Sequence, residues 1–358
     1  MNETGDVLFE ARHGVGFITL NRPKALNALT LPMIHAISPQ LAAWQEDSTI
    51  KAVVVRGSGD RAFCAGGDVR AVWQAGKAGD RMTEDFFREE YRLNRLIHVF
   101  AKPYVALIDG VTMGGGVGLS VHGSHRVAGD RTLLAMPEVG IGLFPDVGGT
   151  WFLPRLPGRL GLFLALSGWR LKAADAIYCG LATDYVASDR MDALAEAFTE
   201  IDWTTDDAEL LVDRVIDRFK ADPGESELAP HREVIDHCFS ARSVESILAA
   251  LDAAAKKEGD DWAAKVAGLI RRASPTSLKV TFAQLEKGAA LGFDAAMVQE
   301  YRLSQAFMAG SDFYEGIRAL LVDKDNKPQW TPATLDAVTP QAVEAHFAPL
   351  GDRDLTFP

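Results

Sequence analysis

The stretch that decides the fold is residues 102–154, KPYVALIDGVTMGGGVGLSVHGSHRVAGDRTLLAMPEVGIGLFPDVGGTWFLP. It opens with the apolar run Tyr104–Ile108, which is rich in β-forming residues and is closed by Asp109 and Gly110. A short run of this kind predicts a buried strand in a mostly parallel sheet. The triple glycine at 114–116 follows, and the residues after it predict a loop that turns into a helix. We expect the active site in this stretch.

The triple glycine permits two interpretations. The first amide N–H groups of a helix lack intrahelical partners and lie at the positive end of its dipole, so they can hold an oxygen that gains negative charge. Glycine also lets a ligand carbonyl approach the backbone closely. A helix that merely packs through its glycines against a sheet accounts for the same residues, and the glycine motif alone leaves both interpretations open.

Two acids follow the glycines. Glu138 comes after a Met-Pro pair and Asp146 after a Phe-Pro pair, both in apolar, turn-prone surroundings. Apolar burial raises the pKa of a carboxyl group, and two neighbouring carboxyl groups titrate together, so one can act as a base or nucleophile and the other as an acid. Acids in loops also serve structural roles, and this alternative stays open when the pair is considered alone.

Composition narrows the function classes. The 358 residues are 47% hydrophobic and 24% charged, which is typical of a globular protein, and the net charge of −12 argues against a nucleic-acid partner. Cys64, Cys179 and Cys238 form no C-x-x-C pair, so neither a disulfide framework nor a thiolate zinc site is indicated. His122 and His125 lack the H-E-x-x-H context, and we expect no metal site.

The first twenty residues carry acids where a targeting peptide would carry arginine or lysine. No apolar run reaches the length that spans a membrane. From these observations we expect a soluble cytoplasmic protein with no membrane partner.

The first half of the chain alternates between strands and helices. The runs Val7–Glu10 and Val15–Leu20 predict a hairpin, and the period of Leu29–Glu46 predicts a helix with Thr30 as its N-cap. A predicted strand at Ala52–Gly57 and a predicted helix at Phe86–Phe100 continue this alternation. This order predicts an α/β fold built from a right-handed βαβ array.

Strand signals stop near residue 202. We therefore predict two parts: a core with the active site over 1–202, and a helical extension over 203–358 that packs on the core. The extension consists of amphipathic segments near 206–220, 232–239, 244–257, 262–272, 278–288 and 295–309.

Several motifs carry a family resemblance. NRPKALNAL at 21–29, AFCAGGD at 62–68, GVTMGGGVGLSVHG at 110–123 and AMPEVGIGLFPDVGG at 135–149 resemble the enoyl-CoA hydratase/isomerase (crotonase) superfamily. The stretches FFREEYRLN, LFPDVGGTWFLPRLPG, SPTSLKVT, EYRLSQ and DFYEGIRALLVDKD resemble a subgroup of acyl-CoA hydrolases within it. The resemblance spans nearly the whole chain.

The resemblance implies a crotonase-like spiral of ββα units and an acyl-CoA thioester substrate. Coenzyme A is then part of the substrate, so no separate cofactor is expected. The resemblance also implies an oxyanion hole formed by the backbone N–H groups of Gly67 and Gly115. Ala65 and Asp68 would lie near the adenine end of coenzyme A. Lys24 could meet its phosphates, although a solvated lysine is at least as consistent with the sequence.

One departure from the superfamily pattern bears on the reaction. Similar hydratases carry two catalytic glutamates, one just after the triple glycine and one at the position of Glu138, but here the first position is Gly118. The hydrolase-like pair Glu138 and Asp146 is complete, and Glu90 matches a substrate-contacting position of that subgroup. The resemblance therefore implies hydrolysis of a short β-hydroxyacyl-CoA to the free acid and coenzyme A, as a step of valine breakdown.

Other interpretations remain at this point. Glu138 could be a nucleophile or could activate a water, and Asp146 could orient the substrate hydroxyl or the water. An enoyl-CoA hydratase or isomerase could work with Glu138 alone. A non-catalytic acyl-CoA-binding protein could use the same fold. A homo-oligomer is expected by family analogy only.

Overall fold

The computed structural model describes residues 5–258 and 261–357. The chain forms two compact units. The first comprises residues 1–68, 92–134 and 170–229, and the second comprises 69–91, 135–169 and 230–358. The division into a core over 1–202 and an extension over 203–358 stays a prediction.

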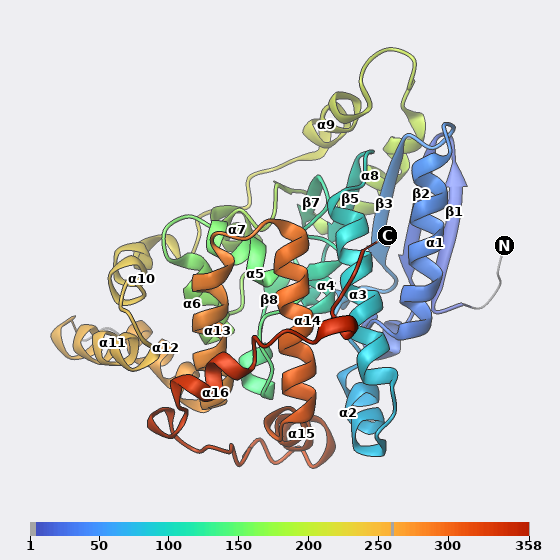
Figure 1. Cartoon of the computed structure of the whole chain (residues 1–358). Helices are drawn as coiled ribbons and strands as arrows, with labels where there is room; N and C mark the ends of the chain where they lie inside the picture. Colours follow the sequence, from blue (N-terminus) through green and yellow to red (C-terminus); the bar gives the residue numbers. More distant parts are fainter. Residues whose placement is uncertain (1–4, 259–260, 358) are drawn as a thin grey trace. The chain divides into compact units, whose positions relative to one another are not determined.

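The first unit contains a six-stranded sheet in the order β1-β2-β3-β5-β7-β9 (Figure 1). Strand β1 is antiparallel to β2, and every later neighbour is parallel, as the apolar runs predicted. The strands are β1 (Val7–Arg12), β2 (Val15–Leu20), β3 (Ala52–Gly57), β5 (Tyr104–Ile108), β7 (His125–Ala128) and β9 (Asp184–Tyr185).

A second sheet contains three short strands, β4 (Ala62–Cys64), β6 (Val111–Met113) and β8 (Leu133–Ala135), in the order β4-β6-β8. From β3 to β8 the chain alternates between the two sheets, so each turn adds one strand to each sheet. This alternation is the spiral of ββ units that the resemblance implied. The short strands were not predicted, because three residues are too few to show an alternating pattern.

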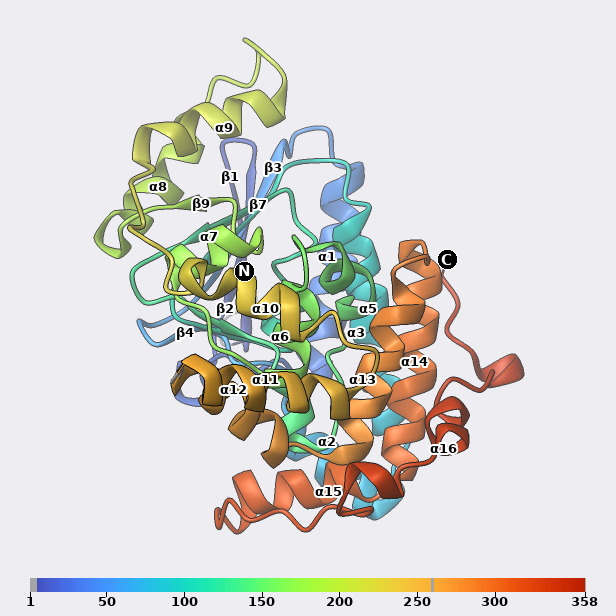
Figure 2. The same ribbon diagram turned by 90° about the vertical axis from the view of Figure 1, so that its left-hand side faces the viewer.

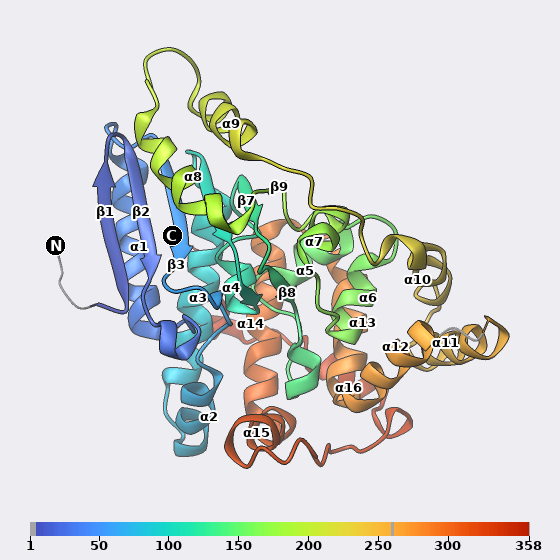
Figure 3. The same cartoon turned by 180° about the vertical axis from the view of Figure 1, so that it is seen from behind.

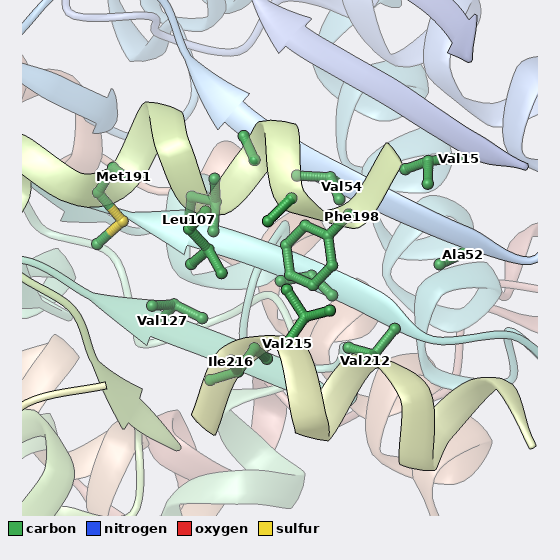
Figure 4. Close-up of a cluster of buried hydrophobic side chains, with 14 of the residues drawn as sticks. Val15, Ala52, Val54, Leu107, Val127, Met191, Phe198, Val212, Val215 and Ile216 are labelled. Carbon is green, nitrogen blue, oxygen red and sulfur yellow. The ribbon is translucent and has the colours of Figure 1, made fainter. Parts of the chain in front are cut away.

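Different helices cover the two faces of the six-stranded sheet. Val54 and Leu107 belong to a buried cluster with Phe198 and Val215, beneath α8 (Met191–Ala197) and α9 (Ala208–Phe219) (Figures 3 and 4). Gly16 alternates with the cluster residues of β2, so it faces the other side. A Cβ there would lie 2.7 Å from the Trp44 ring, which places α1 (Leu31–Glu46) on that opposite face.

Helix α1 begins at the predicted cap. The Thr30 side chain accepts a hydrogen bond from the Met33 amide at 3.3 Å. Leu29 was predicted to be helical, but its backbone instead forms a parallel bridge with Gly67. The helix therefore begins two residues later than predicted, at Leu31.

The second unit is helical. The segments after residue 230 that were predicted to be helical are helices, and α13 and α14 both contact α5 (Figures 1 and 2). The unit includes α2 (Val69–Ala78), the first part of α3 (Met82–His98), α5 (Gly149–Phe152), α6 (Leu160–Ser167), α10 (Arg232–Cys238), α11 (Val244–Glu258), α12 (Asp261–Arg272), α13 (Pro275–Gly288), α14 (Phe293–Ala309), α15 (Asp312–Ile317) and α16 (Pro340–Ala345).

Candidate active site

In the first unit, the AFCAGGD loop lies directly against the triple glycine. A Cβ at Gly66, whose φ is +112°, would lie 3.2 Å from the Met113 carbonyl oxygen and 3.8 Å from the Gly115 amide nitrogen. A Cβ at Gly116 would lie only 2.1 Å from the Cys64 carbonyl oxygen. The two segments can approach this closely only because they are built from glycine.

Two backbone N–H groups at this junction are left for a ligand. Leu29 donates to the Gly66 carbonyl at 2.8 Å and accepts from the Asp68 amide at 2.7 Å, so the intervening Gly67 N–H points away from Leu29. Gly115 is the first residue of α4 (Gly115–Gly118), where an N–H has no intrahelical acceptor. Within residues 5–258 and 261–357, neither N–H has a protein acceptor.

Helix α4 is too short to supply the strong helix dipole that was expected from the sequence. The helix spans four residues, all of them buried, so it contributes far less dipole than a full helix would. Any stabilisation of an oxyanion at Gly115 therefore comes from the N–H group itself. The close contact between Gly116 and Cys64 instead fits the packing interpretation. Gly115 therefore offers an N–H group to a ligand, whereas Gly116 allows close packing.

Asn27 holds the start of the loop. Its buried amide nitrogen donates to the carbonyl oxygens of Ser58 at 3.0 Å and Ala62 at 2.8 Å, while its side-chain oxygen accepts from the Arg22 amide at 2.9 Å. Its φ is +54°, a conformation that asparagine tolerates better than most residues. These bonds tie the NRPKALNAL segment to β4.

The residues expected to contact coenzyme A lie on or near this loop. Ala65 is half-buried, and its N–H donates to the Leu26 carbonyl at 3.0 Å. The Asp68 carboxylate pairs with the Arg22 guanidinium at 3.2 Å, whereas Lys24 is exposed. Arg22 is thus a cation beside the loop that the sequence analysis did not single out, although it belongs to the NRP motif.

In the second unit, the structure buries all three predicted acids. Glu138 begins a 3₁₀ turn and is 5% exposed, Asp146 is 5% exposed, and Glu90 on α3 is 2% exposed. The Tyr91 hydroxyl donates to Oδ2 of Asp146 at 2.9 Å. Oε2 of Glu138 and Oε1 of Glu90 have no hydrogen-bond partner in the described part of the chain. Buried polar oxygens usually have a partner, so these two are available to a ligand or a water.

The carboxyl groups interact electrostatically. Burial raises the pKa of Asp146 to about 7, against the lowering effect of the Tyr91 hydrogen bond. Burial, and then the charge of Asp146, raise the pKa of Glu138 well above its usual value. Burial and the charges of Asp146 and Glu138 do the same for Glu90. The three carboxyl groups are therefore electrostatically coupled, and together they can supply both a base and an acid.

The loop that carries Asp146 has an unusual backbone. Val147 has φ +50°, which is an outlier for a β-branched residue and costs about 1–2 kcal/mol. Glu300 of α14 accepts hydrogen bonds from the Gly148 amide at 2.8 Å and the Thr150 amide at 2.7 Å. Tyr91 and Glu300 were not predicted as site residues, although both lie in stretches that carry the resemblance.

The chain is similar to known proteins over nearly its whole length. The profile of the family "Enoyl-CoA hydratase/isomerase" matches residues 15–347. A curated relative from Danio rerio, named "3-hydroxyisobutyryl-CoA hydrolase, mitochondrial", is 52% identical over 98% of this chain and 91% of its own length. The relative of the same name from Homo sapiens is 47% identical, with the same shares of the two chains.

Two solved structures are similar to this fold. A carnitinyl-CoA dehydratase from Mycobacterium thermoresistibile is 43% identical, with a TM-score of 0.91 over 99% of both chains. An enoyl-CoA hydratase from Rhodobacter sphaeroides is 39% identical, with a TM-score of 0.89 over 99% of this chain and 100% of its own. These comparisons confirm the predicted crotonase-like fold.

The relatives' names correct the expected location. Both curated relatives are named as mitochondrial proteins, so the cytoplasmic expectation is wrong. One premise, cysteines that form no pair, does not distinguish one reducing compartment from another. The other, acids in the first twenty residues, does not outweigh the match to these relatives over 98% of the chain. In the described residues, no helix combines the length and apolarity needed to cross a bilayer. The same residues contain no cluster of three or more His, Cys, Asp or Glu side chains suited to a metal ion.

Proposed function

Because this chain belongs to the enoyl-CoA hydratase/isomerase family, we propose that it hydrolyses 3-hydroxyisobutyryl-CoA to 3-hydroxyisobutyrate and coenzyme A, as a step of valine breakdown. The observation that carries the proposal is the identity of about 50% to curated hydrolases with that substrate, over 98% of the chain. Gly118 supports it, because a glycine cannot supply the second acid that similar hydratases use.

The backbone N–H groups of Gly67 and Gly115 form the oxyanion hole of the proposed mechanism. The N–H groups of Gly67 and Gly115 donate to the thioester oxygen, which gains negative charge when the carbonyl carbon is attacked. Their lack of protein acceptors supports this role. Ala65 and Asp68 contact the adenine end of coenzyme A, which is part of the substrate, and no resident cofactor takes part.

Three carboxyl groups act on the substrate in the proposed mechanism: those of Glu138, Asp146 and Glu90. Glu138 either attacks the acyl carbon or removes a proton from the water that attacks it. Asp146 orients the substrate hydroxyl or the water and helps to deliver a proton to the departing sulfur. Glu90 contacts the substrate, and its unpartnered oxygen supports this assignment. In both routes the carbon–sulfur bond breaks and the sulfur leaves as the thiol of coenzyme A. The water oxygen ends in the free acid if Glu138 is a base, and in the free acid or in Glu138 if Glu138 is the nucleophile.

The test is thiol release from 3-hydroxyisobutyryl-CoA by the purified protein. Glu138→Gln keeps the shape of the side chain but removes its base, and it should lower kcat by about a thousandfold. Glu286→Gln removes an exposed carboxylate on α13 and is the matched control. A wild-type protein that releases no coenzyme A, or a Glu138→Gln variant with unchanged release, contradicts the proposal. Label in the Glu138 carboxyl after a single turnover in heavy-oxygen water would identify the nucleophilic route, because it requires an acyl-enzyme.

A hydratase or dehydratase activity is the second candidate. The names of the two similar solved structures favour it, and Glu138 alone can move a proton. Loss of crotonyl-CoA absorbance, or its appearance from a 3-hydroxyacyl-CoA without thiol release, would favour this candidate over the hydrolase. Acyl-CoA binding with no turnover of either substrate would instead indicate a non-catalytic binding protein.

Assembly is a separate proposal by family analogy. We propose that the protein forms a homo-oligomer and binds neither nucleic acid nor membranes, which agrees with its net charge of −12. Sedimentation equilibrium at micromolar concentration tests the assembly, and a mass equal to one 38.8 kDa chain would contradict it.

A further inference from the structure

The loop over residues 145–150 needs support to keep its shape. Val147 holds a left-handed backbone conformation, and Gly148 follows with φ +94°. Such a conformation persists only where the surroundings fix it. Asp146 immediately precedes these two residues, so the direction of its carboxyl group depends on what holds the loop.

Glu300 supplies much of that support. It is completely buried on α14, and its two oxygens each accept one loop amide: Oε2 from Gly148 at 2.8 Å and Oε1 from Thr150 at 2.7 Å. Both oxygens accept, which the carboxyl group can do whether it is ionised or protonated. Gln284 of α13 adds hydrogen bonds to the Pro145 carbonyl at 2.7 Å and the Thr150 hydroxyl at 2.8 Å.

We propose that Glu300 is a positioning residue that holds the Asp146 loop in its productive conformation. This inference rests on the proposed role of Asp146 in thioester hydrolysis. Glu300 belongs to the EYRLSQ stretch, to which the mechanism assigns no step. It acts on the reaction through the loop, and it touches neither the thioester nor the attacking water.

Glu300 also acts on its neighbours through its charge. The titratable groups coupled to it are Asp146 in the loop, Glu138 in the 3₁₀ turn, and Glu90 and Tyr91 on α3. The Glu300 charge raises the pKa values of Glu138 and Glu90 further. Burial raises the pKa of Glu300 itself to about 8, although the Gly148 and Thr150 amides oppose this shift.

The test compares Glu300→Gln with Glu300→Asp and with the exposed control Glu286→Gln. In Glu300→Gln the side-chain NH2 group faces a loop amide, so one hydrogen bond is lost. We expect kcat to fall about tenfold with KM changed less than about threefold, because the bound geometry of the reacting groups is impaired. Because the pKa of Glu300 is about 8, its charge acts on Glu138 mainly above that pH, so Glu300→Gln should lack the change in the pH dependence of kcat that Glu300 ionisation causes near pH 8. Glu300→Asp keeps an ionisable carboxyl group and should keep a change of this kind.

Amide hydrogen exchange gives a readout that is independent of activity. Exchange at Gly148 and Thr150 should accelerate at least about tenfold in Glu300→Gln and remain unchanged in Glu286→Gln. Unchanged exchange overturns the inference whether or not the protein is a thioesterase, and so does a fall in kcat with an unchanged pH dependence near pH 8. A wild-type protein without thioesterase activity overturns the proposed function alone. If Glu300→Gln does not fold, Glu300→Asp, whose shorter side chain cannot reach both amides in the same geometry, provides the same exchange measurement.

Discussion

Asp146 makes the stability of the protein depend on pH. Burial raises its pKa to about 7 from the usual 3.8, so the folded state favours the protonated form. A carboxyl group shifted in this direction gives its full stabilisation below pH 3.8. That stabilisation is lost as the pH rises through about 7. At alkaline pH the buried charge therefore destabilises the fold that holds it.

The variant Asp146→Asn tests this linkage. Asparagine can still accept the Tyr91 hydroxyl, but it cannot ionise. The variant should unfold about 2–5 °C above the wild type near pH 8, and this advantage should shrink near pH 5, where wild-type Asp146 is protonated. Calorimetry at the two pH values measures the difference. An equal difference at both pH values would show that Asp146 is not the group responsible.

At the scale of elements, the contact between β4 and α4 depends on glycine. Gly116→Ala would place a methyl group 2.1 Å from the Cys64 carbonyl oxygen, a backbone atom that cannot rotate away. We expect a loss of about 3 kcal/mol or more in stability, together with loss of thioester turnover as the Gly115 N–H is displaced. Thermal unfolding and the thiol-release assay check both effects.

Gly268→Ala is the control for this substitution. Gly268 lies inside α12, and a Cβ there meets no atom within 4 Å. The same change should raise stability by about 0.5–1 kcal/mol, because alanine restricts the unfolded chain and favours helix. A wild-type melting temperature in Gly116→Ala would contradict the close approach of the two elements.

Elements with a clear period could be predicted from the sequence. Strands β2, β3 and β5 lie at the predicted residues, and Thr30 caps α1 as predicted. The three-residue strands carried no period, and their existence depends on pairing with one another. The α3 helix begins at Met82 rather than Phe86, because the prediction followed only its apolar residues.

The candidate site was predictable only in part. Local surroundings indicated Glu138 and Asp146, and the family motifs indicated Gly67, Gly115 and Glu90. The partners of Asp146 lie far away in sequence: Tyr91 is 55 residues before it, and the loop amide of Thr150 bonds to Glu300 150 residues later. No local pattern can report a hydrogen bond that tertiary packing creates. The roles of these residues stay predictions.

At the scale of the whole molecule, the three cysteines are buried. Cys64, Cys179 and Cys238 form no disulfide bond in the described part of the chain and have 0% exposure. A buried thiol in apolar surroundings is inert. The native protein should therefore show almost no fast reaction with a thiol reagent such as DTNB, and all three cysteines should react after unfolding in urea. Fast labelling of a cysteine in the native protein would contradict this burial.

The distance in sequence between Asp146 and Glu300 also affects biosynthesis. The ribosome adds about 5–20 residues per second, so Glu300 is added roughly 8–30 s after Asp146. Until α14 has left the exit tunnel, the Gly148 and Thr150 amides lack Glu300 as their acceptor. The strained conformation of Val147 then lacks full support. A nascent chain stalled before residue 300 should therefore be unable to hold Asp146 in place. The loop acquires its hydrogen bonds to Glu300 only after α14 has been synthesised.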